Sequence, residues 1–138
     1  MHKALFLVLL LAASPALAAP QGDSTATALQ RCLDRPDNAS TAGQVDCETE
    51  AAHGYDRRLN TAYAALIRAL PPKAAQQLRQ SQRAWLAFRD AERVASGAIF
   101  ATRQGTMFVP MQASASVNVI RDRALQLESY RRIIAIGP

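Results

Sequence analysis

Two adjacent prolines, Pro71 and Pro72, constrain the fold of this 138-residue chain more than any other feature of its sequence. On both sides of them, apolar residues recur at every third or fourth position, which is the pattern of an amphipathic helix. A proline interrupts a helix when it lies inside it, but it suits the first position of a new helix. The sequence therefore predicts two long helices joined by a tight turn.

Four helices are expected in all, over about 25–33, 41–70, 72–103 and 117–136. Ser40 or Thr41 is expected to cap the second helix, because a short polar side chain can accept a hydrogen bond from the first turn. Residues 106–116 are expected to form an irregular connection. No segment alternates with a period of two. We therefore predict an all-α fold, a small antiparallel helical bundle in which a C-terminal helix packs on a long helical hairpin.

Each long helix has an apolar stripe that is expected to face the core. In the second helix it contains Val45, Ala52, Tyr55, Leu59, Ala62, Leu66 and Ala69. In the third it contains Leu78, Ser81, Trp85, Phe88, Glu92, Ala95 and Ile99, with Leu86 on its flank. In the last it contains Val117, Ile120, Ala124, Leu127, Tyr130 and Ile134.

The first 18 residues are expected to form a cleaved signal peptide. Lys3 gives a basic start, residues 4–13 are apolar, and Ala16-Leu17-Ala18 matches a signal-peptidase site. The apolar run is shorter than the ~20 residues that a membrane-spanning helix needs, and no cysteine is present for lipid attachment. We expect a periplasmic or secreted single domain over 19–138, with its core at about 28–136 and no transmembrane segment after cleavage.

The sequence contains two cysteines, Cys32 and Cys47. An exported chain with two cysteines favours a disulfide between them. Zinc binding is the alternative, but a structural zinc site takes four ligands and His53 is the single histidine of the mature chain. We therefore predict one disulfide, which would stabilise the fold by about 3 kcal/mol.

Charge is distributed unevenly along the chain. The formal net charge is +4 without residues 1–18, with −3 over 19–60 and +7 over 61–138. The acidic part is expected to present a local negative face formed by Asp46, Glu48, Glu50 and Asp56. The basic part is either a solvated helix surface, which we favour, or a surface that attracts an anionic polymer. Without a binding motif, nucleic acid is not an expected partner.

Little in the sequence indicates catalysis. Glu50, His53 and Asp56 share a helix face and could hold a metal or move a proton, but such a trio is more often a solvated surface. The chain has no nucleophile elbow, zinc-binding HExxH motif or phosphate-binding loop. We therefore expect no enzymatic activity, no catalytic residue, no cofactor and no metal.

Two polar motifs carry most of the information about function. They read Asp56-x-x-Leu59-Asn60-x-x-Tyr63 and Gln82-Arg83-x-Trp85-x-x-Phe88-Arg89-Asp90. Helical spacing places the polar residues of each motif on one side of its helix. We expect the two polar sides to meet across the hairpin and fix its register.

Specific pairs are expected across this hairpin. Asp56 is expected to pair with Arg83 or Arg89, and Asn60 to hydrogen-bond with Gln82, since a partly buried polar group is costly unless it is matched. A ligand pocket lined by Tyr63, Trp85 and Arg89 is the alternative interpretation.

Together with Cys32, Thr41 and Cys47, these motifs resemble the lysozyme inhibitor LprI-like N-terminal domain family, over about residues 28–130. The resemblance implies a small exported helical domain and, for one branch of the family, inhibition of lysozyme. Members of the family often have a second disulfide, which this chain lacks. Arg93 stands about where its first cysteine would be, and residues 114–117 contain no second one. The connection at 105–116 is therefore not held by that bridge.

Two functions follow as expectations. The first is a cell-envelope protein that inhibits lysozyme by direct contact. The second is a binding or assembly module for another envelope protein or an anionic polymer. Met107, Phe108, Val109 and Met111 are candidate contact residues, because clustered apolar residues in an exposed connection often mark a contact site. Their alternative role is to fold back and complete the core.

Overall fold

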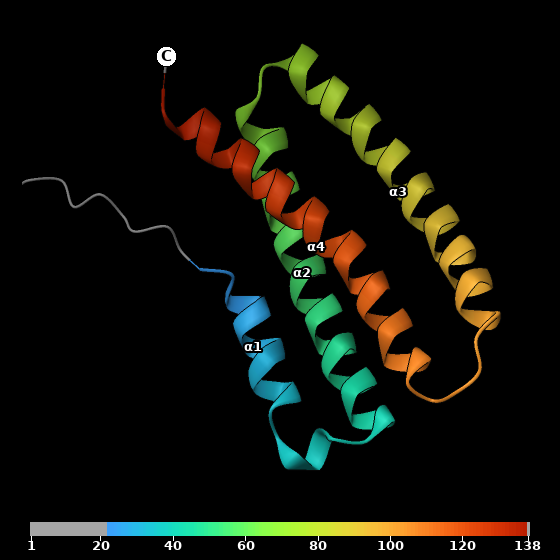
Figure 1. Ribbon diagram of the computed structural model, residues 1–138. Coiled ribbons are helices and arrows are strands. Elements are labelled where there is room, and N and C mark those ends of the chain that lie inside the picture. Colours follow the sequence, from blue (N-terminus) through green and yellow to red (C-terminus); the bar gives the residue numbers. More distant parts are fainter. Residues whose placement is uncertain (1–21, 138) are drawn as a thin grey trace, which may run out of the picture.

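The computed structural model describes residues 22–137, and in this range the protein is helical throughout, without strands (Figure 1). The elements are α1 (Ser24–Leu33), a short 3-10 helix η1 (Pro36–Asn38), α2 (Thr41–Ala69), α3 (Pro72–Ala101) and α4 (Phe108–Ala135). The predicted all-α fold is confirmed. The predicted signal peptide, residues 1–18, lies outside the described residues.

The core lies between α2 and α4, which contact each other more than any other pair of helices (Figure 1). Its fully or nearly fully buried residues are Ala51, Tyr55, Leu59, Ala62, Leu66, Val117, Ala124 and Leu127. Most of the stripe predicted for α2 is therefore buried. The stripe predicted for the last helix is buried up to Leu127, whereas Tyr130 and Ile134 are exposed. No helix within residues 22–137 is both long and apolar enough to cross a membrane.

The ends of α2 follow the sequence prediction. The Ser40 hydroxyl accepts a hydrogen bond from the Gly43 amide at 3.1 Å and caps the N-terminus. At the other end the helix ends before Pro71, and Pro72 is the first residue of α3. The amide groups in the first turn of a helix have no partner within the helix, so the missing amide hydrogen of Pro72 costs no hydrogen bond there. The two prolines therefore end one helix and begin the next.

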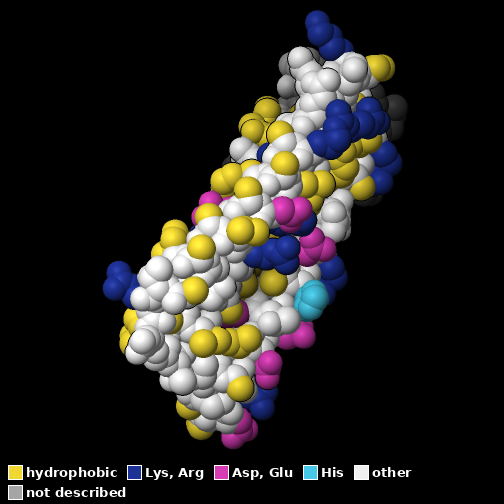
Figure 2. Space-filling view, turned by 90° about the vertical axis from the view of Figure 1, so that its right-hand side faces the viewer, with side chains coloured by type: hydrophobic (Ala, Val, Ile, Leu, Met, Phe, Trp, Pro, Cys, Tyr) yellow, Lys and Arg dark blue, Asp and Glu magenta, His cyan; other side chains and the backbone are white. Residues whose placement is uncertain are grey.

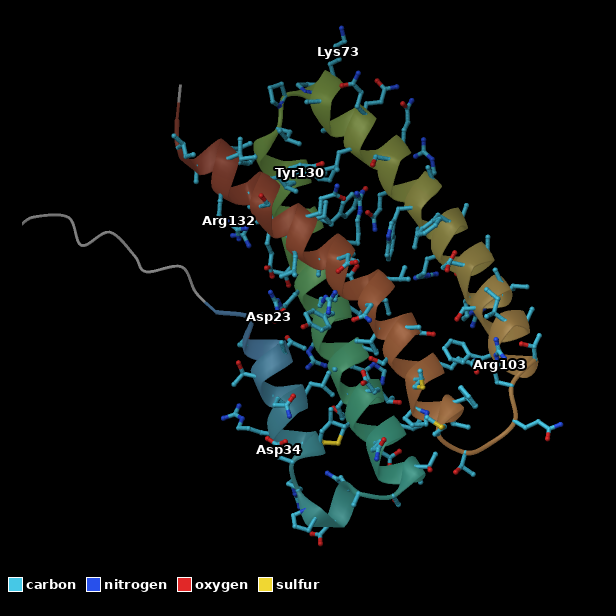
Figure 3. The ribbon with its side chains drawn as sticks, in the orientation of Figure 1. Asp23, Asp34, Lys73, Arg103, Tyr130 and Arg132 are labelled. Carbon is cyan, nitrogen blue, oxygen red and sulfur yellow. A yellow bond between two sulfur atoms is a disulfide. The ribbon has the colours of Figure 1, made fainter. Side chains whose placement is uncertain are left out.

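Helix α1 contains no buried residue but is fastened to α2 at both ends. The Cys32–Cys47 disulfide, predicted from the sequence and visible as a yellow bond in Figure 3, joins the end of α1 to α2, with the two Cα atoms 5.7 Å apart. At the start of α1, the Asp23 carboxylate accepts hydrogen bonds from Tyr55 and Arg58. Helix α1 approaches α2 closely at Gly54, which has no side chain. A Cβ atom at this position would lie only 2.9 Å from the Thr25 methyl group of α1.

The irregular connection predicted over 106–116 is wrong for most of its length. Helix α4 begins at Phe108, and only a turn around Gly105, with φ +115°, separates it from α3. Pro110 occupies the first turn of α4, where a missing amide hydrogen removes no helical hydrogen bond. The proline therefore indicated a helix start rather than an irregular segment.

Candidate binding surfaces

The two sequence motifs meet at a cavity of about 380 Å³ between α2 and α3. Its lining includes every motif residue except Phe88 and Asp90: Asp56, Leu59, Asn60 and Tyr63 from α2, and Gln82, Arg83, Trp85 and Arg89 from α3, together with Arg79 and Leu86. The two polar sides therefore line one cavity, but no hydrogen bond or ion pair joins them across the hairpin among the described residues, so a role in fixing its register stays a prediction. Tyr63, Trp85 and Arg89, which were considered as a ligand pocket, are all part of this lining.

The polar groups of this cavity pair differently from the prediction. Asp56 accepts a hydrogen bond from Asn60 on its own helix at 2.9 Å, and Arg89 binds its neighbour Asp90 at 2.8 Å. The Gln82 carbonyl oxygen accepts a hydrogen bond from Arg123 of α4 at 3.0 Å. The expected pairs of Asp56 with an arginine and of Asn60 with Gln82 are wrong, because nearer partners satisfy these groups.

Arg123 belongs to the basic part of the chain, which was expected to be a solvated surface or to attract an anionic polymer, but it is buried beside the motif residues of α3. Its side chain is 6% exposed and binds neutral acceptors only, on Ser81, Gln82 and Gln126. Burial lowers the pKa of its guanidinium. Two guanidinium groups lie near the Trp85 ring, with Arg89 at 5.5 Å and Arg123 at 6.0 Å from its centroid, which is the distance range of cation–π attraction. Arg123 lies three residues after Ile120 and four before Leu127, so helical spacing placed it beside the apolar stripe of α4, and this sign of burial could have been found in the sequence.

Helix α3 turns an apolar face away from the rest of the protein. The exposed residues of this face are Ala84, Ala87, Phe88, Ala91, Val94, Ala95, Ala98 and Ile99. We call them the outer face of α3. Figure 2 looks onto this side and shows hydrophobic side chains distributed along the molecule, with basic side chains gathered toward its upper end. The largest are well exposed, with Phe88 at 54%, Val94 at 71% and Ile99 at 65%.

The core-facing stripe predicted for the third helix is therefore partly wrong. Phe88, Ala95 and Ile99 were expected in the core but are exposed. The side that turns inward contains Ala75, Leu78, Gln82 and Trp85, and only Ala75 and Gln82 are buried. The physical reason is that α2 and α4 bury their apolar stripes against each other. Helix α3 packs beside this pair with its inward side, and no part of the described protein covers its outer face.

The contact residues predicted before the last helix lie in and next to the first turn of α4. Met107, Val109 and Met111 are exposed, and Phe108 is half-buried. None of them belongs to the buried core of the described residues, so the alternative of core completion is wrong. Met107 and Met111 line a further cavity that also contains Glu48.

The predicted acidic face is incomplete. Asp46, Glu50 and Asp56 are exposed as expected, but Glu48 is only 6% exposed. His53 is exposed between Glu50 and Asp56 on α2. Within residues 22–137, no three histidine, cysteine or acidic side chains are grouped closely enough to hold a metal ion.

The sequence matches the model of a known protein family. The model of the family described as lysozyme inhibitor LprI matches residues 21–127. The chain belongs to this family. The resemblance identified from the two motifs is thereby confirmed. No curated protein matches the sequence.

A solved structure of similar fold comes from Burkholderia thailandensis. It is the crystal structure of an uncharacterised protein, with 35% sequence identity and a TM-score of 0.79. The match covers 86% of this chain and 58% of the other, so the chain spans less than two thirds of that relative's length. The arrangement of helices is therefore shared with a protein that is longer than the matched part.

Proposed function

We propose that this protein is an exported, non-enzymatic inhibitor of lysozyme that acts by direct protein–protein contact. The observation that carries the proposal is membership of the lysozyme inhibitor LprI family over residues 21–127. Residues 1–18 would direct export, and the Cys32–Cys47 disulfide suits the oxidising compartment that lies beyond the membrane.

The outer face of α3 supports contact with a protein partner. A soluble protein rarely leaves large apolar side chains in one contiguous surface unless that surface binds something. Phe88 and Ile99 provide the largest apolar side chains along one edge of this face, and small alanines between them allow close approach of another backbone. We propose this face as the main contact with lysozyme.

Long-range charge does not assist this association. Common lysozymes are basic, and this chain carries a formal net charge of +5 with residues 1–18 and +4 without them. Repulsion between two basic proteins slows encounter at low salt. The affinity must therefore come from apolar burial and from local acidic groups.

An inhibition assay tests the proposal. Purified residues 19–138, with the disulfide formed, are expected to slow the lysis of bacterial cell walls by a basic lysozyme and to approach full inhibition near equimolar amounts. Phe88→Ser should weaken inhibition by about tenfold or more, because a large aromatic residue that a partner covers often contributes much of the binding energy of an interface. The folded structure should survive, since Phe88 is more than half exposed.

Ile133→Ser is the matched control. It removes a similarly exposed apolar side chain, 59% accessible, from the C-terminal part of α4. Inhibition by this variant should equal that of the unmodified protein. Undiminished lysozyme activity at a large excess of the protein would contradict the proposed function, whereas equal effects of the two variants would contradict only the assignment of the contact to α3.

A further inference from the structure

A cavity of about 430 Å³ opens between the beginnings of α2 and α4, beside the end of α1. It combines two kinds of lining. Apolar side chains come from Leu33, Met107, Pro110 and Met111, and polar groups come from Thr41, Gln44, Glu48, Thr106 and Ser114. Glu48 is the one ionisable residue in this lining. The cavity lies apart from the α2–α3 motif cavity and shares no residue with it.

Glu48 is an unusual residue for this position. Its side chain is 6% exposed, and its Oε2 atom is buried without a hydrogen-bond partner among the described residues. Burial raises the pKa of the Glu48 carboxyl, and the nearby Ser114 hydroxyl opposes this only in part. A buried carboxylate is costly unless a donor or a cation reaches it. The adjacent Cys47, fixed by the disulfide, holds this position of α2 in place.

The chemistry of the lining selects the type of ligand. Lysine and arginine side chains consist of an apolar methylene stem and a cationic head that carries several hydrogen-bond donors. The stem would contact Leu33, Pro110 and the methionines, and the head would reach Glu48. A divalent metal ion fits less well, because calcium takes six to eight oxygen ligands and magnesium needs octahedral geometry, while the lining offers one carboxylate.

We propose that this cavity receives one lysine or arginine side chain of a partner protein. In naming lysozyme as that partner, the inference rests on the proposed function. A local anionic socket explains how a basic inhibitor can bind a basic enzyme in spite of their overall repulsion. The exposed side chains of Met107 and Met111 provide an adaptable apolar rim around it.

The socket is tested first without lysozyme. N-acetyl-lysine methylamide is titrated into residues 19–138 while amide chemical shifts are followed by NMR, with N-acetyl-norleucine methylamide as the uncharged probe. We expect saturable shifts at Glu48 and Ser114 with the lysine probe and at least tenfold weaker binding in Glu48→Gln. Glu50→Gln is the matched control, since it makes the same charge change on the same helix at an exposed position. Equal shifts with both probes, or no shifts at Glu48, would overturn the inference.

The same variants are then compared in the lysozyme assay. Glu48→Gln should weaken inhibition at least tenfold, and Glu50→Gln should leave it within twofold. If the unmodified protein inhibits lysozyme and Glu48→Gln inhibits equally well, the socket is overturned while the proposed function stands. If the unmodified protein does not inhibit lysozyme, the proposed function fails, and the NMR titration alone decides whether the cavity receives a basic side chain.

Discussion

Arg58 of α2 holds Glu128 of α4 through two parallel hydrogen bonds, each 2.7 Å long, from Nε and Nη2 to the two carboxylate oxygens. Its remaining terminal nitrogen, Nη1, binds Asp23 at the start of α1. One side chain therefore connects three helices whose residues lie 35 and 70 positions away in the sequence. All three side chains are less than a quarter exposed, so solvent weakens these contacts only moderately.

Arg58→Ala should lower the free energy of unfolding by about 3 kcal/mol, because it leaves two partly buried carboxylates without a cation. Arg58→Lys should cost about 1 kcal/mol, since lysine keeps the charge but cannot form the two-pronged contact. Urea denaturation followed by circular dichroism measures both. Losses of equal size in the two variants would contradict the role given to the geometry of the guanidinium.

Asp23 should make the fold sensitive to acid. Burial alone would raise the pKa of its carboxyl, but hydrogen bonds from Tyr55, Arg58 and the Ala26 amide lower it below the usual value. A lowered folded-state pKa gives stability that is present above the unfolded value of about 3.9 and is lost as the pH falls through the folded value. Asp23→Asn should therefore cost about 2 kcal/mol at pH 7, and the cost should shrink as the pH falls below about 3.9. A cost that is independent of pH would contradict this assignment.

Removal of the disulfide should destabilise the fold substantially. The double variant Cys32→Ser/Cys47→Ser should lose about 3 kcal/mol, because a loop of 15 residues regains its freedom in the unfolded chain. Since α1 has no buried residue, its amide hydrogens should exchange faster than those of α2 in this variant. Hydrogen-exchange mass spectrometry measures this difference. Unchanged protection of α1 would show that the contacts of Asp23 are sufficient to hold it.

Glu48→Gln should stabilise the isolated protein at neutral pH, by about 1 kcal/mol. Burial raises the pKa of Glu48 in the folded state, so the ionised carboxylate disfavours folding above that value. As the pH falls through the raised pKa, the carboxyl is protonated and the advantage of the variant should disappear. Thermal unfolding at pH 7 and pH 4 measures the change. A less stable variant at pH 7 would indicate that the carboxylate has a favourable partner.

The sequence was sufficient to predict features that depend on neighbouring residues. The Ser40 cap, the end of α2 before Pro71, the start of α3 at Pro72 and the Cys32–Cys47 bond all follow from local chemistry. The buried stripe of α2 was also predictable, because an apolar period close to that of a helix marks one face.

Features that depend on which helices meet were not predictable in the same way. Periodicity placed Phe88 and Ile99 on the apolar side of a helix. It could not show that the apolar stripes of α2 and α4 pack against each other and leave this side of α3 uncovered. The burial of Glu48 and Arg123 depends on the position of α4, and the contacts of Arg58 join distant parts of the chain. Asp23 lies before the first helix, which was predicted over about 25–33, and it caps α1 by accepting a hydrogen bond from the Ala26 amide.

The central claim is that this protein binds lysozyme directly through an apolar surface. Isothermal titration calorimetry of residues 19–138 with a basic lysozyme at physiological salt, repeated at several temperatures, tests it most directly. The account predicts one binding site with a dissociation constant of about 1 μM or lower and a negative heat-capacity change from apolar burial. Absence of binding heat at every temperature, with both proteins folded and at concentrations of about 100 μM, would contradict it.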